Sequence, residues 1–203
     1  MRAFGNSRIL SLKLQLSNME TIKAIQSRNS ISSLAEPIPN ADQMEQVYQS
    51  ALRAPDHAWL RPWRFIQVTG ESRSKLSEAF IKTYKALGQD MTDDLSIKIS
   101  QAPFRAPMVI ILIADIKDHP KVPEIEQILS TGAAAQNMLI TLHDMGYAGI
   151  WRTGKMSFNE HISNFLELPR SNKVIGYLYV GTPEGRVKGI PTLETKDFVS
   201  VWN

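Results

Sequence analysis

The sequence predicts an α+β protein in which helices surround a small central sheet. Three stretches support this class: a continuous apolar run at 107–115, a long helical pattern at 123–145, and a second strand pattern at 173–183. A continuous apolar run is typical of a strand that is covered on both faces. Because no internal repeat or low-complexity linker interrupts the chain, we expect a single domain over residues 19–203.

The first part of this domain alternates helices and a strand. Met19, Ile22 and Ile25 predict a short helix that runs into the segment SRNSIS. Asn40 and Gln43 have the spacing of a capping box, and the apolar residues that follow recur at helical spacing. After them the sequence predicts three elements: a strand at 64–70, an amphipathic helix at 72–87 closed by Gly88, and a shorter helix at 93–101.

The long helix at 123–145 is the strongest single pattern, with Gly146 expected just beyond its C-terminus. Its middle, 131–142, is small or apolar on nearly every side, which indicates a helix buried in a core or an interface. A further helix is expected to be capped within Ser157–Glu160. The last 20 residues show no strong periodicity.

Charge is unevenly distributed along the chain. Residues 1–18 contain Arg2, Arg8, Lys13 and no acid, and without these three the 23 basic residues fall to 20, equal to the 20 acidic ones. A duplex-binding face is therefore not indicated. No apolar run approaches the roughly 18 residues of a membrane span. Residues 1–18 also lack the pattern of a secretory signal, so we interpret them as an N-terminal tail and expect a cytoplasmic protein.

The chain contains no cysteine, which excludes disulfides, thiolate catalysis and Cys-ligated metal centres. Any redox chemistry must therefore belong to a bound cofactor. The four histidines show no metal-ligand spacing, and the sequence has no nucleophile elbow, P-loop or dinucleotide fingerprint. We expect neither a metal site nor a catalytic side chain. The histidines are His57, His119, His143 and His161.

Three segments place an arginine beside small polar groups: 27–30, 53–57 and 151–154. A guanidinium can bind two phosphate oxygens while hydroxyl and backbone N–H groups bind the others. For any one of these arginines taken alone, a surface ion pair is the expected interpretation. Tryptophan and histidine in the segment 53–65 can border a flat heteroaromatic ring, and its prolines stiffen the loop. A planar, phosphorylated cofactor would explain this composition.

From about residue 19 to 203 the sequence resembles the nitroreductase family of FMN-dependent flavoenzymes, especially its small members. The segments RAPDH at 53–57 and GIWRTG at 149–154 are the most specific part of the likeness. RNSISSLAEPIP, APFRAPMVIILIA, HPKVPEIEQILSTGAAAQNML and IGYLYVGTP extend it in the same order. The resemblance implies a nitroreductase-like fold and a homodimer that binds FMN between its subunits.

The resemblance also implies which residues contact FMN. Arg28 and Ser30 match the family's phosphate and ribityl motif, while Asn29 replaces its usual second arginine. Arg152 would be a second phosphate clamp beside Arg28. Arg61 could favour the negative charge of the reduced flavin or pair with a surface carboxylate, and we expect the latter. The further contacts implied are Arg53 and His57, from the partner subunit as in related dimers, and Trp151 and Thr153.

A second ligand, NAD(P)H, is implied near the end of the long helix. The residues concerned are Thr141, Leu142, His143, Asp144, Met145 and Gly146. The negative end of a helix dipole is a poor place for phosphates, so the nicotinamide or an adenine edge is the expected contact. In the alternative interpretation Leu142 and Met145 are core residues, while His143 and Asp144 are solvated.

The activity implied is transfer of hydride from NAD(P)H through FMN to a nitroaromatic, a quinone or a similar electron-poor acceptor. The alternatives are a flavin-binding protein with a sensing or storage role, and a reductive dehalogenase or dehydrogenase on the same fold. FMN is expected rather than FAD because the chain has no dinucleotide fingerprint. A homodimer is further suggested by Gly132 and the three alanines after it, which permit close helix approach, and by the apolar residues in the tail 182–203.

Overall fold

The computed structural model describes residues 20–88, 90–186 and 188–202. At its centre is a five-stranded antiparallel sheet in which β5 pairs with β3, and β3 pairs with the edge strand β2. The strand β4 pairs with β5, and the two-residue β1 pairs with the end of β5. The strands are β1 (Leu34–Ala35), β2 (Trp63–Thr69), β3 (Met108–Asp115), β4 (Ala148–Arg152) and β5 (Asn172–Pro183).

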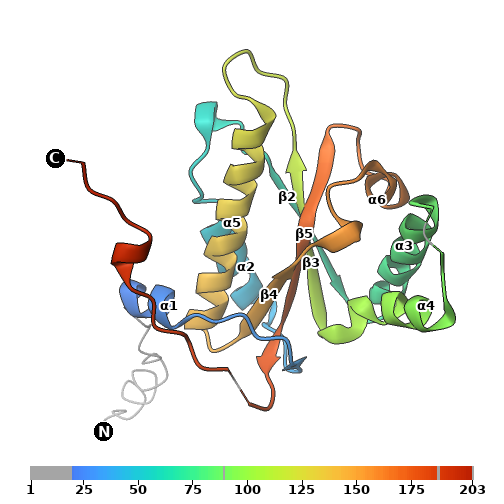
Figure 1. Cartoon of the computed structure of the whole chain (residues 1–203), viewed down its shortest axis with the longest axis horizontal. Helices are drawn as coiled ribbons and strands as arrows, with labels where there is room; N and C mark the ends of the chain where they lie inside the picture. The colour runs from blue at the N-terminus through green and yellow to red at the C-terminus, as the bar shows by residue number, and fades with distance from the viewer. Residues whose placement is uncertain (1–19, 89, 187, 203) are drawn as a thin grey trace, which may run out of the picture.

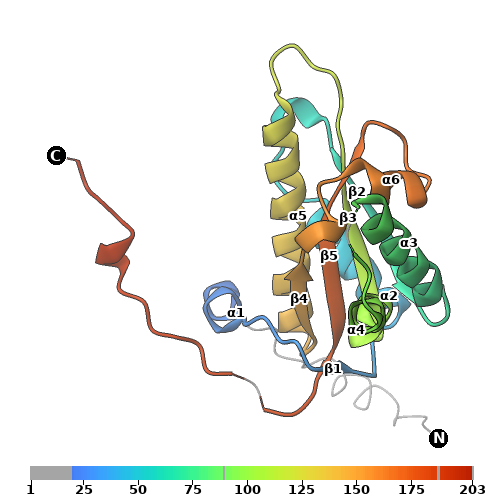
Figure 2. The ribbon, with the colours of Figure 1, turned by 45° about the vertical axis from the view of Figure 1, so that its right-hand side comes forward.

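Helices cover both faces of this sheet and form a three-layered body (Figures 1 and 2). On one face lie α2 (Ala41–Ala51) and the long α5 (Glu124–Asp144). On the other lie α3 (Ser72–Ala86), α4 (Asp93–Ser100) and α6 (Glu160–Phe165). The short α1 (Thr21–Ser27) contacts α5. Together these elements confirm the α+β class expected from the sequence.

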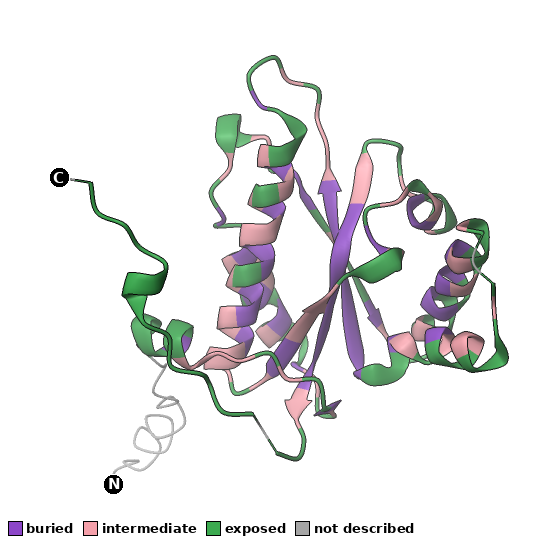
Figure 3. Ribbon diagram, viewed as in Figure 1, coloured by how far each residue is buried: buried purple, intermediate pink, exposed green. Residues whose placement is uncertain are grey.

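The strand β3 separates two hydrophobic cores. Met108, Ile110 and Leu112 face the helices α2 and α5, whereas Val109 and Ile111 face the α3 side. Every residue of β3 except the last is buried (Figure 3). Burial on both faces is the reason that this strand is continuously apolar rather than alternating.

The helix ends mostly follow the sequence. The Asn40 side chain accepts from the backbone N–H of Gln43, and the Gln43 side chain accepts in return from Asn40, so the expected capping box is confirmed. Gly146 follows the C-cap of α5 with φ +82°, a conformation that glycine adopts without steric cost. α6 is capped within the expected segment, by Asn159, whose side chain accepts from the Ile162 backbone N–H.

The strands β1 and β4 were not expected from the sequence. β4 is five residues long, contains a glycine, and shows no clear alternation of apolar and polar side chains. Its strand conformation results from pairing with β5, in a register that places Trp151 opposite Leu178. A short strand defined by its partner leaves little pattern in its own sequence.

The small residues of α5 serve this chain's own core. Ala134 and Ala135 are fully buried, and the Cα of Gly132 faces the Trp151 ring, where an added Cβ would lie 3.5 Å from Cη2. They therefore do not provide the close contact with another subunit that the sequence suggested. The apolar residues that α5 does expose are Ile125 and Leu129, at 58% and 65%.

The segment after β5 extends away from the body in both ribbon views (Figures 1 and 2). It contains one short 3₁₀ helix, Thr195–Asp197, and exposes several apolar side chains. Trp202 is 98% exposed. The expected tail at 1–18, and Met19 of the first helix, lie outside the described residues. Within the described residues, no helix combines the length and apolar character needed to cross a membrane.

Candidate functional site

The segment that follows α1 lies along the outer edge of β4. Ser30 forms a parallel bridge with Gly149, and the backbone N–H of Ile31 donates to the Gly149 carbonyl. The Gly149 carbonyl therefore faces away from β5. Because backbone groups alternate between the two edges of a strand, those of Trp151 also face the outer edge. In the described part of the chain no strand pairs with this edge beyond Gly149.

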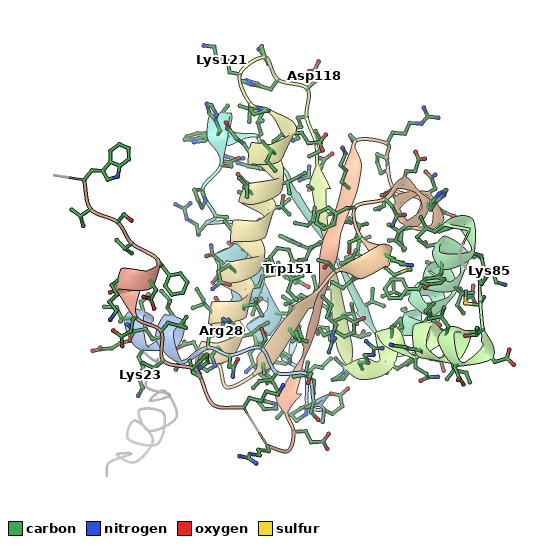
Figure 4. The ribbon with its side chains drawn as sticks, in the orientation of Figure 1. Lys23, Arg28, Lys85, Asp118, Lys121 and Trp151 are labelled. Carbon is green, nitrogen blue, oxygen red and sulfur yellow. The ribbon has the colours of Figure 1, made fainter. Side chains whose placement is uncertain are left out.

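Arg28 lies just before this bridge, at the C-terminal end of α5 (Figure 4). Its Nη1 is buried and has no hydrogen-bond partner among the described residues. Such an atom is costly to leave unsatisfied, and an anion would satisfy it. Ser27 Oγ and His143 Nε2 are 2.8 Å apart beside it. Burial, and then the nearby Arg28 charge, lower the pKa of His143 below its usual value.

Asn29, which stands where the family has a second arginine, is hydrogen-bonded within the chain. Its Oδ1 accepts from the Ser30 backbone N–H at 2.8 Å, and its Nδ2 donates to the Lys188 carbonyl at 2.9 Å. Asn29 therefore joins the turn at 28–30 to the segment after β5.

Trp151 projects from β4 toward α5 and lies between two glycines (Figure 4). A Cβ added at Gly176 would lie 2.0 Å from Trp151 Nε1, so only glycine leaves room for the indole there. The indole Nε1 is buried and has no partner among the described residues. The indole therefore packs inside the body, and it is the backbone of Trp151 that faces the open edge.

Arg152 points to the opposite face of the sheet, because successive side chains of a strand alternate. Its guanidinium carbon lies 5.7 Å from the centre of the Tyr179 ring, and its Nε is buried without a partner in the described region. Arg28, by contrast, acts on His143 of α5. Within one chain the two arginines thus flank β4 from opposite faces, and they do not form the joint phosphate clamp expected from the sequence.

The side chain of Arg152 lines a hollow of about 410 Å³ between β4, β5 and the helices α3 and α4. Lys98, Arg105 and Lys155 also line this hollow. The sequence analysis gave none of these three residues a role. They come from three separate segments that only the fold brings together, so no sequence motif contains them.

The loop at 53–65 forms a second hollow of about 410 Å³ on the molecular surface. Ala58, Trp59 and Arg61 all have positive φ, between 48° and 58°. Arg61 lies over the Trp59 ring at 5.9 Å, and its backbone N–H donates to the Asp56 carboxylate. The expected ion pair of the Arg61 side chain with a surface carboxylate is not formed among the described residues. Trp59 is 79% exposed.

His57 lies far from Arg28 in a single chain. His57 Nδ1 is 2.9 Å from a Glu126 carboxylate oxygen in the first turn of α5, and Arg53 is exposed. His143 stands in the last turn of the same helix, 17 residues later, which corresponds to about 25 Å at 1.5 Å per residue. His57 and Arg28 therefore lie at opposite ends of α5, whereas Arg53 lies nearer its middle, where the Ser50 carbonyl accepts from both the Arg53 backbone N–H and Asn137 Nδ2.

The segment 141–146, expected to contact NAD(P)H, lies partly in the core and partly at the surface. Leu142 is fully buried and Met145 packs against the core, so the side chain of Leu142 cannot contact a dinucleotide. Thr141 Oγ1 donates to a carbonyl of its own helix. His143 and Asp144 are partly exposed, and Gly146 is exposed. Thr141 and Met145 are also partly exposed, so Leu142 is the one residue of this segment that is fully buried.

Among the described residues there is no group of three or more His, Asp or Glu side chains that could hold a metal ion. The site consists instead of buried cationic nitrogens on both sides of an open strand edge. In an α+β protein, such nitrogens beside the central sheet are suited to an anionic ligand. The sequence profile of the Nitroreductase family matches residues 25–182, so the chain belongs to the nitroreductase family, as its resemblance implied.

Similar proteins agree with this membership. The chain is 34% identical over 166 residues to an Escherichia coli (strain K12) protein assigned to the NAD(P)H nitroreductases, YdjA, covering 82% of this chain and 90% of that one. A nitroreductase-like protein from Bacillus cereus shares the fold with a TM-score of 0.77 at 19% identity, over 90% and 96% of the two chains. The FMN and NADPH-dependent nitroreductase NfnB of Sphigopyxis sp. strain HMH has a TM-score of 0.70 at 15% identity, over 91% and 100%.

Proposed function

We propose that this protein is an FMN-dependent oxidoreductase that passes hydride from NAD(P)H to a small electron-poor acceptor, such as a nitroaromatic or a quinone, and that it works as a cytoplasmic homodimer. Family membership and the names of its relatives support the enzyme class. The observation that carries the proposal is the buried Arg28 Nη1, which lacks a partner in the described structure and lies beside the open edge of β4.

Arg28 binds the phosphate in this proposal, and the hydroxyl of Ser30 binds the ribityl chain. The backbone groups of Trp151 and Thr153 that face the outer edge of the strand orient the flavin ring. Ser30 pairs with this edge only at Gly149, so the edge beyond Gly149 is open to the flavin. Arg152 adds positive charge from the other face of β4. Bound FMN would supply the hydride-transfer chemistry itself. In the segment assigned to NAD(P)H, Gly146 is exposed and every other residue except Leu142 is partly exposed.

A homodimer would bring together Arg28 and His57, which lie at opposite ends of α5 within one chain (Figure 4). If two copies pack with their α5 helices antiparallel, Arg53 and His57 of one copy lie beside Arg28 of the other. Ile125 and Leu129 are exposed on α5, and the segment after β5 adds further exposed apolar side chains. Apolar surface of this kind is typical of a contact between subunits.

The cofactor is tested by absorbance of the purified protein and by chromatography of the group released on heating. We expect FMN, whereas FAD or a colourless protein that takes up no FMN would contradict the proposal. Arg28→Ala removes a charge-assisted hydrogen bond of about 1.5–3 kcal/mol, so FMN affinity should fall about tenfold to a hundredfold. Lys23→Ala is the control, since Lys23 is exposed on α1 (Figure 4).

The assembly is tested by light scattering, which should report about twice the chain mass of 22.8 kDa. Leu129→Asp places a charge on the exposed face of α5 and should yield a monomer that binds FMN more weakly. Ile97→Asp is the matched control, because Ile97 is exposed on α4 at 63%. A Leu129→Asp protein that remains a flavin-loaded dimer would show that α5 is not in the interface.

A further inference from the structure

The hollow between β4, β5 and the helices α3 and α4 carries positive charge that the described part of the chain does not neutralise. Lys98 comes from α4, Arg105 from the 3₁₀ helix Ala102–Arg105, and Arg152 from β4. None of the three belongs to an ion pair among the described residues, and no described aspartate or glutamate lines the hollow. The local potential is therefore positive.

The Arg152 side chain holds a donor that needs an acceptor. Its Nε is buried and has no hydrogen-bond partner among the described residues, and its guanidinium carbon lies 5.7 Å from the centre of the Tyr179 ring. Burial raises the pKa of Tyr179, whereas the charges of Arg105 and Arg152 lower it, so both guanidinium groups act on the Tyr179 hydroxyl. A buried guanidinium donor without a partner is costly, and an anionic oxygen is the acceptor that satisfies it best.

Apolar and aromatic side chains form the rest of the wall. The rings of Phe80 and Tyr177 meet edge to face with their centres 4.9 Å apart, and both residues line the hollow together with Met156. Lys155 Nζ lies 5.2 Å from the centre of the Tyr84 ring, so this side chain is already engaged within the chain and we do not assign its charge to a ligand. A ligand that fills such a hollow needs a flat apolar body as well as an anionic group.

We propose that this hollow binds a small aromatic carboxylate, of the benzoate type, as a ligand that takes no part in hydride transfer. The ring lies against the tyrosines, and the carboxylate binds Arg105 and Arg152. A carboxylate can lie in the plane of its ring, so the whole ligand stays flat. A volume of about 410 Å³ is at the small end of ligand sites and suits one substituted ring rather than a nucleotide.

This site is separate from the phosphate site of the proposed function. The hollow lies on the α3 side of β4, whereas Arg28 acts on His143 of α5, on the other side of that strand. The inference therefore does not depend on the cofactor, and it adds a second ligand to the protein.

The experiment follows the Met156 methyl group by NMR in FMN-loaded protein that is labelled at the methionine methyls. Met156 lines the hollow, and Met44, buried in the core on the α2 and α5 side, is the internal control. Benzoate is titrated in parallel with benzamide, which has nearly the same shape without the charge, and with acetate, which lacks the ring. We expect benzoate to shift the Met156 signal and to bind at least about tenfold more tightly than either of the other two.

Arg105→Gln should remove most of the preference for benzoate over benzamide. Arg105 is exposed, so this variant should fold, which circular dichroism checks. Arg170→Gln is the matched control and should leave the preference unchanged, because Arg170 is exposed before β5 and does not line the hollow.

Equal affinity for benzoate and benzamide, a Met156 signal that benzoate does not move, or an unchanged preference in folded Arg105→Gln would overturn the inference. So would benzoate binding that apo protein shows and FMN-loaded protein loses, because the hollow would then be the seat of the flavin. A protein that takes up no FMN contradicts the proposed function instead. The titration is then made on the chain as purified, and its result decides this inference by itself.

Discussion

Gly176 determines whether Trp151 can occupy its place beside the site, so Gly176→Ala is the sharpest test of this packing. The new methyl group would lie 2.0 Å from Trp151 Nε1, 2.7 Å from Cδ1 and 3.0 Å from the Arg152 carbonyl oxygen. Gly176 also has φ +150°, which L side chains rarely adopt. The indole must therefore move, and with it the end of β4.

The loss of unfolding free energy in Gly176→Ala depends on how little space is available for the Trp151 indole to move. Inserting a methyl group into a well-packed core typically costs 1–3 kcal/mol. Gly132 lies against the other end of the ring, with only 3.5 Å from its added Cβ to Cη2. We therefore expect the upper value, about 3 kcal/mol, which corresponds to a fall in Tm of roughly 6–12 °C for a domain of this size.

Gly132→Ala is the matched control on the same ring. Its methyl group makes an ordinary contact, and replacing glycine by alanine inside a helix stabilises by up to about 1 kcal/mol. Its Tm should stay equal or rise by a few degrees. Both variants are unfolded thermally at one protein concentration, since Tm depends on concentration in an oligomer. Similar Tm values for the two variants would refute this account of Trp151.

Two further predictions concern His143 and the start of α2. Arg28→Ala should raise the pKa of His143, seen by NMR titration, because it removes a nearby positive charge; an unchanged pKa would contradict their proximity. The pKa of His143 is lower in the folded protein than the ordinary value of 6.5. Between these two pKa values the unfolded chain binds more protons than the folded one. The stability that neutral His143 contributes above about pH 6.5 should therefore be lost as the pH falls from 6.5 through the folded pKa. Asn40→Ala should cost about 1 kcal/mol in urea unfolding, whereas Asn40→Asp should retain most of that stability.

Sequence patterns correctly predicted those helices and strands whose conformation is determined by their own side chains. The run at 108–114 is a strand because every side chain in it is buried, and the end of α5 follows from Gly146. β4 could not be predicted in this way, because its pairing with β5 determines it. The sequence of the middle of α5 predicted that it is buried. It could not show whether the side chains that bury it belong to this chain or to a second subunit.

The candidate site was predictable only in part for a similar reason. Motifs located Arg28 and Arg152, since each stands in a short segment of characteristic composition. They could not show that the side chains of Arg28 and Arg152 lie on opposite sides of β4. Nor could they find Lys98 and Arg105, whose relation to Arg152 depends on how α3 and α4 fold back onto the sheet.

The open edge of β4 has a consequence for the protein before it binds a cofactor. An unpaired strand edge can pair with the edge of another chain and lead to aggregation. The opposite edge, β2, carries the exposed side chains Arg64 and Gln67, which discourage such pairing, whereas β4 from Ala148 to Trp151 carries no charge. A ligand or subunit seated against β4 would protect this edge. We therefore expect protein stripped of its cofactor to lose solubility before it loses helical structure.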